Sequence, residues 1–163
     1  MENHQTGNRQ AMQRLFNALI AVDEMYCADV RKIGVKESEL WLLYALDDGK
    51  PHSQNQLCQE WGFPKTTLNT TIKQGEAQGH LTLIPIAGKR RERQICLTPA
   101  GQAHARQILR PIYGAEDAAF QAVQDRYGPG FVDEIVEAID YFGQCLRASF
   151  AQKIAEKETD KHP

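Results

Sequence analysis

Apolar residues recur at three- and four-residue steps over much of this chain, a spacing that places them on one face of an α-helix. The first such run predicts a helix from about 9 to 31, and Gly34 ends it. Its apolar positions are Met12, Leu15, Phe16, Leu19, Val22, Tyr26 and Val30. A second helix is predicted over roughly 36–47, with Leu40, Leu43 and Leu46 on one face, and "DDGKP" breaks it.

Two shorter helices are expected next. Ser53 and Gln56 form an S-x-x-Q capping box, which satisfies backbone amides at a helix start. Gly62 then turns the chain, and Pro64 suits the first position of a helix over roughly 64–78 that Gly79 stops. The side chains expected to face inward are Leu57, Trp61, Leu68 and Ile72.

The pattern then changes to that of strands. "HLTLIPIA", from His80 to Ala87, predicts a strand that Pro85 makes an edge strand or an irregular one. After a basic turn, positions 93 to 98 alternate, which predicts a second strand and therefore a hairpin. Thr98 and Pro99 have the character of an N-cap and a first helical position.

The remainder is predicted to be helical. One helix runs from about 99 to 126, and Pro111 must kink or break it. "YGPG" separates it from a last helix, and 157–163 is expected to be a frayed tail. The apolar stripe of the last helix consists of Phe131, Ile135, Ile139, Phe142, Leu146, Phe150 and Ile154.

Composition adds that the chain is an ordinary globular one, with 163 residues, 42% of them apolar and 25% charged. No apolar run approaches the ~20 residues of a membrane helix, and the polar start lacks a signal peptide's apolar stretch. We therefore expect a cytoplasmic protein without a membrane partner.

The sequence contains no residue spacing typical of a metal site or of a catalytic motif. The four cysteines and five histidines are scattered, so we expect reduced thiols, no metal site and no cofactor. No nucleophile elbow or phosphate loop is present, and no residue is predicted to be catalytic. An enzyme is therefore not expected.

Charge is distributed unevenly. From Phe63 to Thr98 there are six basic and two acidic residues, a net charge of +4 in a chain of −2. Four of the cations, Lys89, Arg90, Arg91 and Arg93, lie in five positions at the predicted hairpin turn. A basic segment in an acidic protein indicates a local anionic partner.

The order of elements places this charge in a helix-turn-helix followed by a two-stranded wing. In such an arrangement a short helix braces a second helix that can enter the DNA major groove. The second helix has hydroxyl, amide and cationic side chains and no acid from Pro64 to Gly75. The residues predicted to contact double-stranded DNA are Ser53, Lys65, Thr66, Thr67, Asn69, Thr70, Lys73, Lys89, Arg90 and Arg91.

With these motifs the sequence resembles the MarR-type winged-helix transcriptional regulators over nearly its whole length. "SQNQLCQEWGFPKTTLNTTIKQGEAQGHL" matches the helix-turn-helix, and "KRRERQICLTPAG" matches the wing and the following helix. The family usually has Asp-Arg-Arg in the wing, where this chain has Lys89, Arg90 and Arg91. Leu97, Thr98 and Gly101 match the rest of the motif, whereas Gly75 stands where the family usually has Leu.

The resemblance implies a mainly α fold with a small β-hairpin, a winged helix-turn-helix with N- and C-terminal dimerisation helices. The DNA-binding lobe would span 36–99, and the dimerisation helices 9–34 and 100–156. It further implies a homodimer on a palindromic operator, regulated by a small aromatic or anionic effector. Tyr26, Trp41 and Tyr44 are candidates for its pocket, although their interpretation as core aromatics is the stronger one.

An alternative hypothesis is a winged-helix module for protein–protein interaction without specific DNA binding. Such domains keep the fold but usually lose the basic wing and the polar recognition face. The cluster from Lys89 to Arg93 favours DNA binding over that alternative.

Overall fold

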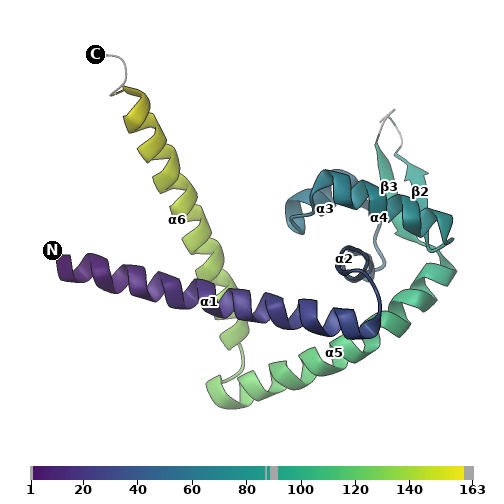
Figure 1. The fold of residues 1–163 in the computed structure, drawn as a ribbon, viewed down its shortest axis with the longest axis horizontal. Coiled ribbons are helices and arrows are strands. Elements are labelled where there is room, and N and C mark those ends of the chain that lie inside the picture. Colours follow the sequence, from purple (N-terminus) through teal and green to yellow (C-terminus); the bar gives the residue numbers. More distant parts are fainter. Residues whose placement is uncertain (1, 87, 89–91, 160–163) are drawn as a thin grey trace. The chain divides into compact units, whose positions relative to one another are not determined.

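The computed structural model describes residues 2–86, 88 and 92–159 (Figure 1). It divides into two compact units, Met1–Pro111 and Ile112–Pro163. The first unit contains α1 (Glu2–Ile33), α2 (Glu37–Leu46), β1 (His52–Ser53), α3 (Gln54–Glu60), α4 (Lys65–Ala77), β2 (Leu81–Pro85) and β3 (Arg93–Leu97). Helix α5 (Pro99–Tyr127) begins in this unit and continues into the second, which also contains α6 (Phe131–Thr159). The predicted fold class, mainly α with a small antiparallel sheet, is confirmed.

The core of the first unit lies between α2, α3, α4 and the sheet. Its buried side chains are Leu42, Ala45, Leu46, Leu57, Phe63, Leu68, Ile72, Leu81 and Ile95. Helix α2 is buried on more than one face, since Leu40, Leu42 and Leu43 are all nearly inaccessible. The prediction that Trp61 faces inward is wrong, because its side chain is 39% exposed. Its ring packs edge-to-face with that of Tyr44, with the two ring centroids 5.7 Å apart.

The predicted hairpin forms as β2 and β3, which pair antiparallel with Leu83 opposite Ile95. Pro85 is the last residue of β2, an edge strand, where its missing N–H costs no ladder bond. A third strand was not predicted. It is β1, whose two residues pair with β3 and which is too short to show an alternating pattern.

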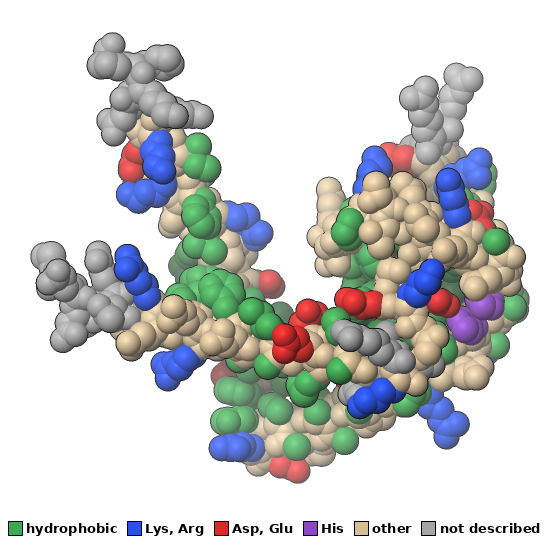
Figure 2. Space-filling view, viewed as in Figure 1, with side chains coloured by type: hydrophobic (Ala, Val, Ile, Leu, Met, Phe, Trp, Pro, Cys, Tyr) green, Lys and Arg blue, Asp and Glu red, His purple; other side chains and the backbone are tan. Residues whose placement is uncertain are grey.

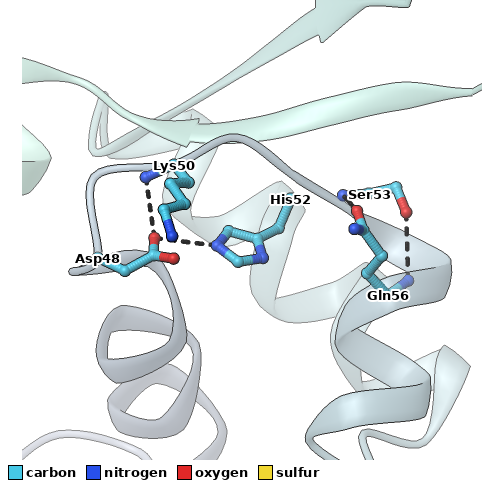
Figure 3. Close-up of polar contacts among 5 residues, drawn as sticks. All are labelled: Asp48, Lys50, His52, Ser53 and Gln56. Atoms are coloured by element: carbon cyan, nitrogen blue, oxygen red, sulfur yellow. Dashed lines mark hydrogen bonds and ion pairs between the residues drawn. The ribbon is translucent and has the colours of Figure 1, made fainter.

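The start of α3 is fixed by the predicted capping box, which the structure confirms (Figure 3). Ser53 N donates to Oε1 of Gln56 over 2.8 Å, and Gln56 N donates to Oγ of Ser53 over 3.2 Å. Just before it, Oδ1 of Asp48 accepts from Lys50 N and lies 3.0 Å from Nε2 of His52. These bonds hold the pKa of Asp48 below its usual range, the His52 bond most strongly.

Helix α4 departs from the family pattern at Gly75, and the structure supplies the reason. A Cβ added at Gly75 would lie 2.6 Å from Cδ1 of Leu81, a buried side chain of β2. Leu81 therefore occupies the space that a larger residue at 75 would need. Pro64 is the N-cap of α4 rather than its first helical residue.

The long helices extend further than their apolar patterns predict. Helix α1 begins at Glu2, and α6 reaches Thr159, within the segment expected to be a tail. Helix α5 is not broken at Pro111, although the boundary between the two compact units falls there. Within the described part of the chain, no helix is both long and apolar enough to cross a bilayer.

Candidate nucleic-acid interface

A groove of about 350 Å³ runs between the start of α3, the exposed side of α4 and the base of the hairpin. It brings together four of the predicted DNA-contacting residues: Ser53, Lys65, Asn69 and Lys73. The other residues that line it are Gln54, Asn55, Ile72, Glu76, Leu83, Glu92, Arg93 and Ile95. Residues of the helix-turn-helix and of the hairpin thus line one groove.

Each predicted residue on α4 is exposed, and the hydroxyl group of Thr70 has a partner within the helix. Thr70 Oγ1 donates to the carbonyl of Thr66 over 3.1 Å, a bond within the helix that leaves the oxygen able to accept. Thr67 lies away from the groove, in a separate cavity with Trp41 and Trp61. Of the hydroxyl residues predicted on this helix, Thr66 and Thr70 therefore remain candidates beside Asn69.

Sequence reasoning missed Gln54. Its Nε2 donates to Oδ1 of Asn69 over 2.5 Å, so the first residue of α3 is tied to the exposed face of α4. The sequence prediction considered the face of one helix at a time, and this hydrogen bond joins two helices. The signal that could have found it is the position of Gln54 directly after the N-cap of the bracing helix.

The charges in the groove nearly cancel. Lys65, Lys73 and Arg93 line it together with the acids Glu76 and Glu92. Figure 2 shows the same mixture, with basic and acidic side chains close together around the hairpin. The predicted wing contacts Lys89, Arg90 and Arg91 lie outside the described residues.

The predicted effector residues belong to a run of aromatic rings. Tyr26 and Trp41 have ring centroids 5.2 Å apart, and Trp41 and Tyr44 5.9 Å apart. Trp41 also lines a cavity of about 670 Å³ with Trp61 and Phe63. Tyr26 and Tyr44 support Trp41 and do not line the cavity, whose walls also carry the carboxylates of Asp23 and Glu37.

The cysteines take no part in either site. Cys27, Cys58, Cys96 and Cys145 are thiols rather than members of disulfides, as the sequence predicts. Burial raises the pKa of the Cys96 thiol, which keeps it protonated and unreactive.

Helices α3 and α4 with the β2–β3 hairpin define a winged helix-turn-helix protein. Residues 33–92 match the model of the MarR family, in agreement with the resemblance seen in the sequence. No curated protein matches the chain.

Solved structures of three similar proteins agree with this fold. A MarR family regulator from Neisseria meningitidis is 16% identical with a TM-score of 0.70, covering 86% of this chain and 96% of its own. MarR of Staphylococcus aureus, in complex with salicylate and kanamycin, is 15% identical with a TM-score of 0.61 over 85% and 94%. BpsR of Bordetella bronchiseptica, whose DNA binding 6-hydroxynicotinic acid regulates, is 19% identical with a TM-score of 0.54 over 78% and 91%.

Proposed function

We propose that this protein is a sequence-specific regulator of transcription that binds double-stranded DNA as a homodimer and acts by binding rather than by catalysis. The observation that carries the proposal is the face of α4 from Lys65 to Lys73, which is polar, exposed and free of acids, beside the groove at α3. A helix with such a face, braced by α3, can lie in the major groove.

The contacts divide by chemistry. Lys65 and Lys73 bind phosphates on either side of the major groove, while Asn69 and Gln54 present amides to base edges. Ser53, Thr66 and Thr70 contribute hydroxyl groups, and Thr67 lies apart from them. In the wing, Lys89 and Arg90 bind phosphates, and Arg91 enters the minor groove, where narrow A·T tracts attract arginine.

Dimerisation is supported by apolar side chains that a single chain leaves in solvent. The stripe residues Ile135, Ile139, Phe142, Leu146, Phe150 and Ile154 on α6 are between 37% and 60% exposed. On α1 the exposed apolar residues are Phe16, Leu19, Ile20, Val22 and Met25. Monomers rarely expose so many large apolar residues along one element. We infer that 9–34 and 100–156 form the dimer interface, and that 36–99 is the DNA-binding lobe.

An effector of aromatic character fits the cavity beside Trp41, Trp61 and Phe63. Related structures hold aromatic acids, and salicylate is one of them. Here the carboxylates of Asp23 and Glu37 favour a neutral or cationic aromatic compound over an anionic one. The chain has two tryptophans, and both line this cavity, so quenching of intrinsic tryptophan fluorescence reports on it directly.

The decisive experiment is selection of bound duplexes from a random DNA pool. We expect a palindrome whose half-sites lie about one helical turn, or ~10 base pairs, apart. Binding without any enriched sequence, or no binding, contradicts the proposal and favours the protein–protein interaction module.

The wing is tested separately with Arg90→Ala and Arg91→Ala. Each should weaken binding to all sequences and reduce the slope of log affinity against log salt by about one, since each phosphate contact releases counterions. If both variants bind the selected DNA as the parent does, the wing makes no contact.

A further inference from the structure

Three side chains with metal-binding chemistry meet on the first unit, away from the groove and from the aromatic cavity. They are Glu39 in the first turn of α2, His80 between α4 and β2, and His104 in α5. One ligand atom from each lies within 4.8 Å of the other two, the only such group of three or more among the described residues. Their wide separation in sequence explains why spacing predicted no metal site.

The ligand atoms of the trio lie near one another. Nε2 of His104 lies 3.1 Å from Oε1 of Glu39. The rings of His80 and His104 stack with centroids 4.2 Å apart and planes inclined by 19°. Bonds of about 2.0–2.1 Å in a tetrahedron separate ligand atoms by roughly 3.3 Å, so binding requires the two imidazoles to rotate out of their stacked arrangement until their nitrogens converge on one ion.

The backbone around His80 is held firmly to the start of α5. His80 N donates to the carbonyl of Gly75 over 2.8 Å, and Thr98 N donates to the carbonyl of His80 over 3.0 Å. Thr98 Oγ1 donates to the carbonyl of Gly79 over 2.6 Å. Gly101 packs so closely against the His80 carbonyl that a Cβ there would collide with it. His80 is thus held against the start of α5, the helix that carries His104, which lowers the cost of binding an ion.

A histidine hydrogen-bonded to a glutamate is by itself an ordinary feature of protein surfaces. The second imidazole is what goes beyond it, because it brings a second nitrogen ligand within 4.8 Å of the other two ligand atoms. A divalent ion can bind both rings in their neutral form while the carboxylate offsets its charge. The side chains of Glu39 and His104 are only 26% and 24% exposed, so the trio is partly shielded from solvent.

From these observations we propose that Glu39, His80 and His104 form a site for a divalent transition-metal ion, with Zn²⁺ as the ion of best fit. Two imidazoles and one carboxylate are a ligand set that zinc accepts while keeping a fourth position open to water. The ion would join α2 and α5 to His80, which lies between α4 and β2. Its regulatory consequence, which rests on the proposed DNA-binding function, is that metal occupancy fixes the orientation of α4 and changes DNA affinity.

Metal binding is tested on the full chain after treatment with a chelator. Co²⁺ is titrated first, since its visible absorption distinguishes tetrahedral coordination from the aqueous ion, and Zn²⁺ then displaces it. We expect one ion per chain, with affinity at least about tenfold lower in Glu39→Gln, His80→Gln and His104→Gln, because even loss of outer-shell partners costs that much. Equal affinity in parent and variants, or no stoichiometric binding by the parent, overturns the site.

Two features make this test specific. Glu39→Gln keeps an oxygen that can accept from His104, so it preserves the fold while it removes the charged ligand, and melting without metal verifies this. His52→Gln is the matched control, because it removes a histidine that also lies beside a carboxylate, that of Asp48, in the same unit. It should leave affinity for Co²⁺ and Zn²⁺ unchanged.

The regulatory consequence is tested by measuring affinity for the selected DNA with and without Zn²⁺. We expect the parent to change affinity by about 5- to 150-fold, the usual range of allosteric coupling, and His104→Gln to show no change. If Zn²⁺ occupies the site and DNA affinity stays the same, the regulatory consequence is wrong. If Zn²⁺ binds while neither form binds DNA, the proposed function fails and the metal site stands.

Discussion

The side-chain amide of Gln54 donates from Nε2 to Oδ1 of Asn69 over 2.5 Å and so joins α3 to the exposed face of α4. The bond uses one of the two lone pairs on Oδ1, so the second lone pair and the Nδ2 donors of Asn69 can still face a base. It also fixes the rotamer of Asn69 before DNA arrives, which reduces the entropy lost on binding. The two amides therefore act as one unit in recognition.

Removal of either side-chain amide should accordingly reduce discrimination between base pairs by a similar amount. We expect Asn69→Ala to lose about 1–3 kcal/mol of discrimination at one base pair per half-site. Gln54→Ala should relax preference at the same base pair, and the double variant should cost less than the sum of the two. Binding to a library of single-base operator variants measures this.

Gln59→Ala is the control for that experiment, because Gln59 is an exposed glutamine of the same helix that does not line the groove. It should keep the parent's preference at every position. Additive effects of Gln54→Ala and Asn69→Ala, or effects at different base pairs, would show that the hydrogen bond plays no part in readout.

The sequence predicts those parts of this fold whose causes are local. The capping box at Ser53, the N-cap at Thr98 and the alternation in β3 each depend on residues a few positions apart, and each is found as predicted. Trp61 was misassigned because helical spacing indicates a face, whereas its exposure depends on how Tyr44 packs against it.

What the sequence could not predict depends on contacts between distant elements. The Gln54–Asn69 bond and the meeting of Glu39 with His104 both join separate helices. The room for a side chain at position 75 is limited by Leu81, a residue of another element. The reason for this departure from the family pattern can therefore be found only in the structure. Residue types identified the candidate DNA face, and the fold decided which of its members share the groove.

The close approach of Gly101 to His80 predicts a large effect on stability. Gly101→Ala places a Cβ against the His80 carbonyl, a backbone atom that cannot rotate aside, so the turn after α4 and the start of α5 must separate. We expect a loss of about 1–3 kcal/mol or more in the free energy of unfolding, measured by urea denaturation.

Gly114 offers a matched control in the same helix, since a Cβ added there meets nothing within 4 Å. Gly114→Ala should stabilise the protein by about 0.5–1 kcal/mol, through higher helix propensity and lower entropy of the unfolded chain. If Gly101→Ala is as stable as the parent, the contact between the turn and α5 is not as tight as described.

The bonds around Asp48 predict how stability depends on pH. Its pKa lies below 3.8 in the folded protein, so its stabilising contribution is complete above pH 3.8 and is lost as pH falls through the folded value. Asp48→Asn keeps the acceptor for Lys50 N but removes the charge beside His52. The variant should be less stable at pH 5 by under about 1 kcal/mol, because the carboxylate is 40% exposed.

That difference should shrink as pH is lowered below 3.8, where the parent's carboxylate becomes protonated. Urea unfolding of both proteins from pH 3 to pH 6 provides the comparison. A difference that stays constant over this range would mean that the His52 pairing does not depend on the charge of Asp48.

The exposed stripe on α6 predicts that a single charge can separate the proposed dimer. Phe150 is 60% exposed within one chain, so Phe150→Asp leaves the monomer's own core intact while it places a carboxylate in the apolar interface. In analytical ultracentrifugation we expect the parent to have twice the mass of one chain and Phe150→Asp to have the mass of one chain. The reason is that dimerisation of the variant would bury an unpaired charge, which is costly. Tyr141→Asp, which removes a 67% exposed aromatic residue from another face of α6, should remain dimeric. A monomeric parent would exclude the dimer, and a Phe150→Asp dimer as tight as the parent's would exclude this stripe as its interface. The same variants also test how dimerisation affects DNA binding. A monomer has one recognition helix and can bind only one half-site, so Phe150→Asp should lose most of the affinity for a palindrome and still bind a single half-site.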